Sequence, residues 1–191
     1  MIVVKIGGSL YSSSHLREWI SHIVTANNQP IIIVPGGGPF ADHIRNVDKK
    51  LKLSSECSHD MAVMAMQQFG HVMCDLDPSL ELLHTVEDMR IISTSAIWAP
   101  YDLVRKHCPY PKNWQTSSDS LSVWLATFIK ASHLCLVKSA QINTDLEAAL
   151  NSDLVDEYFT TALNAYQGKL HLYHASEASL FTRQLENEYF K

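Results

Sequence analysis

Two short apolar runs each end in a glycine-rich turn, and they constrain the fold more than any other feature. Residues 2–6 read IVVKI and lead into Gly7-Gly8-Ser9, while residues 31–34 read IIIV and lead through Pro35 into Gly36-Gly37-Gly38. Short, continuous, β-branched runs are typical of strands buried on both faces of a parallel sheet. Because parallel sheets bind ligands beyond the carboxyl ends of their strands, both glycine turns are predicted to face a ligand.

The rest of the chain alternates further strands with helices. Strands are predicted at 90–94, 133–138 and 169–173, and helices at 13–26, 40–51, 57–74, 119–129, 146–150, 154–166 and from about 176. Ser13 or Ser14 is expected to cap the first helix, and Ser118 or Asp119 the helix that begins near 119. This alternation predicts an α/β fold, with a mainly parallel central sheet between layers of helices. The length of 191 residues predicts one domain over 1–191, in which the Pro-rich segment 107–114 is a loop.

The composition excludes several classes of partner. Hydrophobic residues make up 46% of the chain, charged residues 18%, and the formal net charge is −5, which argues against nucleic acid and against an anionic membrane surface. No apolar stretch is long enough to span a bilayer, and the first ten residues lack the apolar core of a signal peptide. The four cysteines are widely spaced, which indicates reduced thiols, a cytoplasmic location and no metal site built from the protein.

The glycine turns have the chemistry of a phosphate cradle. Without a Cβ atom, backbone N–H groups can approach an anion closely, and the helix that follows adds the positive end of its dipole. Either turn alone could be an ordinary tight turn, but two of them in one short chain favour phosphate binding. Neither matches G-x-G-x-x-G or G-x-x-x-x-G-K-[ST], so a nicotinamide oxidoreductase and a P-loop enzyme are both disfavoured.

Three charged residues accompany these turns. Lys5 interrupts an apolar strand, which is costly unless the ammonium is paired; it could neutralise a phosphoryl group or reach solvent at the strand end. Asp119 lies in NWQTSSDSLSVWLA, where it could be a helix cap or could hold lysines or Mg²⁺ around phosphates. Lys138 ends a strand, where it could contact a phosphate or be an ordinary terminal charge.

Four motifs together resemble the amino acid kinase (carbamate kinase-like) family. They are K-I-G-G-S at 5–9, V-P-G-G-G at 34–38, T-S-S-D-S at 116–120 and L-C-L-V-K at 134–138, in the order found in that family. The resemblance implies a three-layer αβα domain with a shortened C-terminal half. Residues of about 1–110 would bind the acceptor, and residues of about 111–191 the nucleotide.

The resemblance also implies roles for individual residues. Lys5 would contact the transferring phosphoryl group, and Asp119 would orient the active-site lysine. The ATP phosphates would be bound by Gly7, Gly8, Ser9 and Lys138. The acceptor would be bound by Gly36, Gly37, Gly38, His59, Asp60 and Ser117, with Asp60 pairing with a cationic group. Mg²⁺ would be held mainly by the ATP phosphates.

A narrower likeness concerns the helix at 57–74, the stretch 113–126, the strand at 134–139 and LVDEYF at 154–159. These segments resemble the archaeal-type kinases of methanofuran synthesis, which phosphorylate aminomethylfuran-methyl phosphate and have bacterial relatives linked with tetrahydromethanopterin-dependent one-carbon metabolism. The likeness implies an ATP-dependent kinase of a small phosphorylated acceptor, and the Met-rich helix at 57–74 suggests a homo-oligomer, a dimer or higher.

The chain departs from the family after Lys138, where KSAQINTDLEAA lacks the usual Asp and Gly of the nucleotide-binding turn. Two alternatives therefore stay open. One is a carboxylate (amino acid) kinase of the same fold. The other is a non-catalytic ligand-binding or assembly protein that has lost nucleotide binding.

Overall fold

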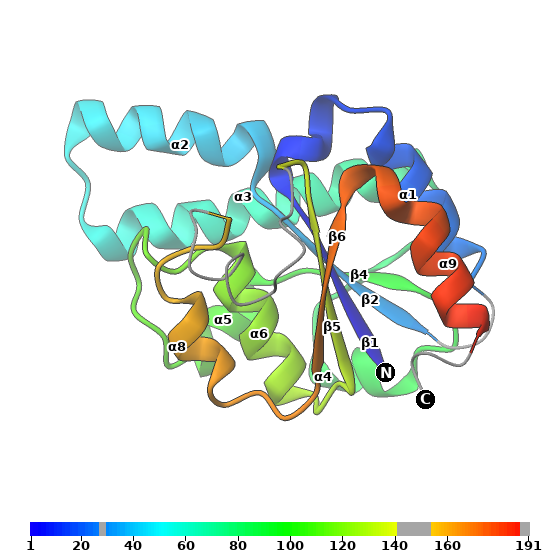
Figure 1. Cartoon of the computed structure of the whole chain (residues 1–191). Helices are drawn as coiled ribbons and strands as arrows, with labels where there is room; N and C mark the ends of the chain where they lie inside the picture. Colours follow the sequence, from blue (N-terminus) through cyan, green and yellow to red (C-terminus); the bar gives the residue numbers. More distant parts are fainter. Residues whose placement is uncertain (27–29, 141–153, 188–191) are drawn as a thin grey trace.

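A six-stranded sheet forms the centre of the computed structural model, which describes residues 1–26, 30–140 and 154–187 (Figure 1). Its strand order is β3–β4–β2–β1–β5–β6, and every neighbouring pair is parallel. The strands are β1 (Ile2–Ile6), β2 (Ile31–Pro35), β3 (Leu82–Leu83), β4 (Ala96–Trp98), β5 (His133–Lys138) and β6 (Lys169–His174). The predicted α/β class with a mainly parallel sheet is confirmed.

Strand β1 lies inside the sheet, between β2 and β5. All five of its residues are buried, which explains why the run is apolar on both faces. Successive side chains of a strand point to opposite faces, so Val4 and Ile6 enter one core and Val3 enters the other. The same alternation directs Lys5 to the face of Val3.

Helices cover both faces of the sheet (Figure 1). One core packs against α1 (His15–Val24), α9 (Ala178–Glu186) and the second half of α3 (Ser55–Leu76). The other packs against α4 (Val86–Ile91), α5 (Tyr101–His107), α6 (Ser118–Phe128), α8 (Phe159–Leu163) and the first half of α3. The short helices η1 (Gly8–Ser12) and η2 (Ala175–Glu177) follow β1 and β6, and α2 (Gly38–Leu51) packs along α3. The predicted three-layer arrangement is confirmed, and the portion after β5 is short.

The third predicted strand is wrong. Residues 86–91 form α4, because Thr85 accepts a hydrogen bond from the backbone N–H of Asp88 and the Asp88 carboxylate accepts one from the backbone of Thr85. This capping box starts a helix that ends at Ile91 and so includes the first two residues of the predicted strand. The strand that pairs with β2 on the side away from β1 is β4, which comes later in the sequence. Neither β4 nor β3 was predicted.

Other boundaries differ by less. The cap of α6 is Ser117, one residue before the predicted candidates, and α2 begins two residues earlier than expected. Ser14 precedes α1 as predicted, and α5 lies in a region for which no helix was predicted. The helix predicted at 154–166 is confined to α8, and the one predicted at 146–150 lies outside the described residues. Within the described ranges, no helix is both long and apolar enough to cross a bilayer.

Candidate active site

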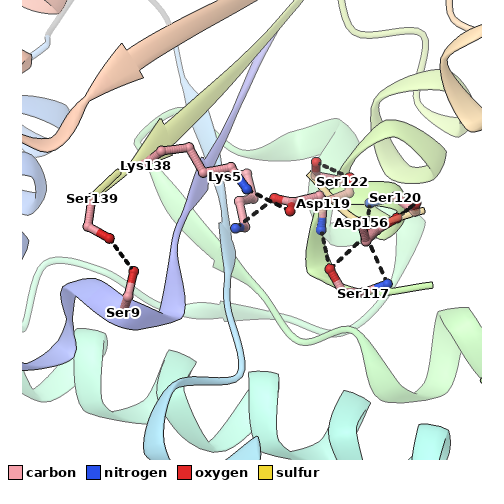
Figure 2. Close-up of polar contacts among 9 residues, drawn as sticks. All are labelled: Lys5, Ser9, Ser117, Asp119, Ser120, Ser122, Lys138, Ser139 and Asp156. Atoms are coloured by element: carbon pink, nitrogen blue, oxygen red, sulfur yellow. Dashed lines mark hydrogen bonds and ion pairs between the residues drawn. The ribbon is translucent and has the colours of Figure 1, made fainter. Parts of the chain in front are cut away.

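A buried carboxylate joins two buried lysines at the carboxyl ends of β1 and β5. The distance from Lys5 Nζ to Asp119 Oδ1 is 2.7 Å, and Lys138 Nζ donates a hydrogen bond to Asp119 Oδ2 at 2.6 Å (Figure 2). The lysines come together because β1 and β5 are adjacent parallel strands, with Lys5 in register with Leu136. Lys5 is only 4% exposed, so it does not extend to solvent as one reading of the sequence allowed.

The three groups carry one more positive than negative charge. Burial by itself would raise the pKa of Asp119, but Lys5 and Lys138 outweigh burial and lower it, so the carboxylate is ionised at neutral pH. Burial lowers the pKa of Lys138 to about 8, helped by Lys5 and opposed by Asp119 and Asp156. Within this group of three, the excess of buried positive charge favours the binding of an anion.

The first turn of α6 is held by a carboxylate from a distant segment. Asp156 Oδ2 accepts hydrogen bonds from Ser117 N at 2.9 Å, Ser117 Oγ at 2.6 Å and Ser120 N at 3.0 Å, and its Oδ1 accepts one from Ser120 Oγ (Figure 2). Ser122 Oγ donates to the backbone carbonyl of Asp119 at 2.6 Å. The lysine-binding carboxylate therefore belongs to a turn that is fixed on both sides.

The two glycine turns lie against each other, backbone to backbone. A Cβ atom on Gly8 would lie 2.4 Å from the backbone nitrogen of Gly38, and one on Gly36 would lie 2.3 Å from the nitrogen of Gly8. Gly38 has a φ of +54°, in the left-handed region that favours glycine. The close packing of the turns, together with this backbone conformation, explains why glycines occupy both turns. This packing brings neighbouring backbone N–H groups together at the carboxyl ends of β1 and β2.

Ser9 connects the first glycine turn to the end of β5. Its Oγ lies 2.8 Å from Ser139 Oγ (Figure 2), and Gly7 N donates to the carbonyl of Val137 at 3.1 Å. The residues predicted to bind nucleotide phosphates, Gly7, Gly8, Ser9 and Lys138, therefore lie together where β1 and β5 end.

Lys5 and Asp119 line a cavity of about 300 Å³. Of the predicted site residues, it is lined by Lys5, Gly8, Ser9, Gly37, Gly38, His59, Ser117 and Asp119. Gly7, Gly36, Asp60 and Lys138 do not line it within the described part of the chain. The cavity therefore joins Lys5 and Asp119 to both glycine turns and to α3.

Two buried polar side chains in the cavity wall have no hydrogen-bond partner among the described residues. They are His59, 3% exposed, and Thr116, 4% exposed. Burial lowers the pKa of His59 against the opposing effect of Asp60, whose Oδ1 is 3.9 Å from Nδ1, too far for a hydrogen bond. A neutral imidazole and a hydroxyl with unmet hydrogen-bonding capacity are suited to a polar ligand.

The cavity contains further residues that the sequence did not identify as candidates. Trp114 lines one wall, and its Nε1 donates to Asp48 Oδ2 at 2.8 Å. The guanidinium of Arg45 lies 4.8 Å from the centroid of the Trp114 ring and is paired with Asp42 at 2.8 Å. Apart from Asp119, Asp42 is the carboxylate residue in this lining. The spacing of Asp42 and Arg45 on α2 was a local signal for the pair, but nothing local placed Trp114 against it.

Comparisons with known proteins identify the family of the chain. Residues 1–188 match the model of the amino acid kinase family. The chain is 31% identical over 154 residues to the [5-(aminomethyl)furan-3-yl]methyl phosphate kinase of Methanocaldococcus jannaschii. This alignment covers 77% of the chain and 67% of the relative.

Solved structures share the fold. The uridylate kinase of Archaeoglobus fulgidus superposes with a TM-score of 0.71 at 14% identity, over 97% of this chain and 96% of the other. An isopentenyl phosphate kinase superposes with a TM-score of 0.62 at 15% identity, over 98% and 96%. With the family match spanning nearly its whole length, the chain belongs to the amino acid kinase family of phosphotransferases.

Proposed function

We propose that the protein is an ATP-dependent kinase that transfers the γ-phosphoryl group to a small acceptor which already carries a phosphate. The observation that carries this proposal is the bridge from Asp119 to Lys5 and Lys138, set between a phosphate-type glycine turn and a ligand-sized cavity. The preferred acceptor is aminomethylfuran-methyl phosphate, since the curated relative is named for this reaction.

The chain's contribution to the transfer is positioning and charge neutralisation. An oxygen of the acceptor phosphate forms the new bond to the γ-phosphorus, the bond from that phosphorus to the β–γ bridging oxygen breaks, and ADP leaves with the electron pair. An ionised phosphate oxygen needs no strong base, so Asp119 does not have to remove a proton. Lys5, at the junction of the cavity and the glycine turn, neutralises charge that develops on the transferred group.

The donor phosphates are proposed to bind at the ends of β1 and β5. In the turn of Gly7, Gly8 and Ser9, the backbone N–H groups of Gly8 and Ser9 would face the phosphates, because Gly7 N already donates to Val137. The Lys138 ammonium would contact the same phosphates. Both carboxylate oxygens of Asp119 already contact lysines, so this residue is poorly placed to be a metal ligand. Mg²⁺ would therefore be held mainly by the ATP phosphates, where it neutralises their charge.

The acceptor is proposed to occupy the cavity, with its phosphate toward Lys5 and the turn of Gly36, Gly37 and Gly38. His59 and Thr116 supply two polar groups that lack hydrogen-bond partners among the residues that the structure describes. Asp60 was predicted to pair with the cationic arm of the acceptor, and this stays a prediction. Asp42 is a better-placed carboxylate, because it lines the cavity and Asp60 does not.

The test is a coupled assay for ADP release with Mg²⁺–ATP and a panel of acceptors. Aminomethylfuran-methyl phosphate is expected to give the highest kcat/KM, above UMP, isopentenyl phosphate and an amino acid carboxylate. A preference for the carboxylate would support the alternative carboxylate kinase. Absence of Mg²⁺–ATP binding by calorimetry at millimolar nucleotide would overturn the kinase proposal and favour the non-catalytic alternative. The expected cytoplasmic location and homo-oligomeric state stay predictions.

A further inference from the structure

Asp156 reaches the site from a part of the chain far from the other charged residues. It lies just before α8, while the serines it binds flank Asp119 on α6. The carboxylate accepts four hydrogen bonds, two from Ser117 and two from Ser120. Such an arrangement satisfies backbone N–H groups that have no partner within a helix and places negative charge at the helix N-terminus.

Further contacts anchor the segment that carries Asp156. Tyr158 N donates to the carbonyl of Gln115 at 3.1 Å. Phe159 is fully buried in the core beneath α6. The Asp156 carboxylate is therefore presented to α6 from a fixed support.

We propose that Asp156 is a positioning residue for phosphoryl transfer, because its carboxylate fixes the first turn of α6 with Asp119 bridged between Lys5 and Lys138. Ser117 and Ser120 are both held by the same carboxylate, and Asp119 lies between them in the sequence. A shift of this turn would move the Asp119 oxygens away from one or both lysines. The inference rests on the proposed kinase function, but the geometry can also be tested without turnover.

Asp156 also acts on Lys138 through its charge. The groups that face Lys138 are Lys5 on β1 and Asp119 on α6, and Asp156 adds a second negative charge that favours the protonated lysine. On β6, the register partner of Lys138 is His174, whose Nδ1 lies 2.8 Å from Ser176 Oγ. Removal of the Asp156 charge is therefore expected to ease deprotonation of Lys138.

The first experiment compares Asp156→Asn with Glu157→Gln, a neighbouring carboxylate bonded to Gln115 and not to α6. Asp156→Asn keeps the size of the side chain but places an amide where N–H donors converge. We expect kcat to fall about 10- to 100-fold with less than a threefold change in acceptor KM, since a misplaced catalytic group costs rate. The alkaline limb of the kcat profile should move to lower pH, and Glu157→Gln should leave both quantities unchanged.

Ser120→Ala separates position from charge, and also serves if Asp156→Asn does not fold. It removes one donor to Asp156 and keeps the carboxylate, so kcat should fall while the alkaline limb stays in place. Asp156→Glu keeps the charge and should keep the limb as well. A kcat within twofold of the wild type in both Asp156→Asn and Ser120→Ala, or an equal loss in Glu157→Gln, would overturn the proposal.

A readout without substrate distinguishes this inference from the proposed function. Urea unfolding across pH 7–10 reports the titration of Lys138 through the rise in stability with pH. In Asp156→Asn this rise should begin at a lower pH than in the wild type. The wild-type protein could show no kinase activity while the increase in stability still begins at a lower pH in Asp156→Asn. The proposed function would then fail, but the coupling of Asp156 to Lys138 would stand. An increase that begins at the same pH in both proteins would disprove that coupling.

Discussion

Lys138, which is proposed to contact the donor phosphates, should lower the stability of the folded protein at neutral pH. Its pKa falls from the usual 10.5 to about 8, first because of burial and then because of the charge of Lys5. Since one pKa unit corresponds to 1.36 kcal/mol, this fall corresponds to about 3 kcal/mol against the folded, charged form. Lys138→Met keeps an unbranched side chain of similar length and removes the charge.

The variant is expected to be more stable than the wild type by about 1–3 kcal/mol at pH 7. The lower part of this range allows for the lost hydrogen bond to Asp119, which is about 1 kcal/mol. Asp119 keeps its ion pair with Lys5 at 2.7 Å, so no buried charge is left alone. Activity should nevertheless fall steeply, because Lys138 is proposed to contact the donor phosphates.

The stability difference between Lys138→Met and the wild type should depend on pH. Between about pH 8 and 10.5 the unfolded chain holds a proton on Lys138 that the folded protein has released. Wild-type stability should therefore rise with pH across this window, and the advantage of Lys138→Met should shrink toward zero. Below pH 8 both states hold the proton, so the full difference is present.

Urea unfolding at pH 7 and at pH 10 measures both quantities. Lys106→Met, a change at an exposed lysine of α5, is the matched control and should stay within about 0.5 kcal/mol of the wild type at both values. A wild type that is more stable than Lys138→Met at pH 7, or a difference that does not shrink at pH 10, would refute the reasoning.

Three further predictions concern the glycine turns and the cavity. Gly8→Ala should lower stability by about 1–3 kcal/mol in urea unfolding and reduce kcat, because its Cβ would meet backbone atoms of Gly38. Gly70→Ala is the control: its Cβ would meet only side-chain atoms, at 3.2 Å, so stability should change by less than about 1 kcal/mol. Lys5→Ala should lower kcat far more than it weakens acceptor binding, and steady-state kinetics with an unchanged kcat would exclude it from the phosphoryl path. Asp42→Asn should raise KM for the aminomethyl acceptor about tenfold at constant kcat, measured beside Asp60→Asn; a larger effect of the latter would return the cationic arm to Asp60.

Local pattern was sufficient for the central strands and for the glycine turns that follow them. Continuous β-branched runs predicted β1 and β2, and the glycines after them predicted turns whose backbone approaches an anion. That the two turns pack against each other was not predicted. Lys5 was recognisable because a charge in a buried strand needs a partner. The strands β3 and β4 were harder to predict, since they are short and are held by their neighbours rather than by their own propensity. A strand was predicted at 90–94, but a helix that starts with a capping box includes residues 90 and 91.

The sequence by itself determined which groups require a partner: a lysine in an apolar strand, the N–H groups of the glycine turns, and Ser117 and Ser120 on either side of Asp119. Only the tertiary structure decided which partners they find. Parallel pairing brings the ends of β1 and β5 together, and α6 lies over the face to which Lys5 points. Asp156 then meets Ser117 and Ser120 across 39 and 36 positions of sequence. These contacts depend on strand register and helix packing, which no local pattern of residues encodes.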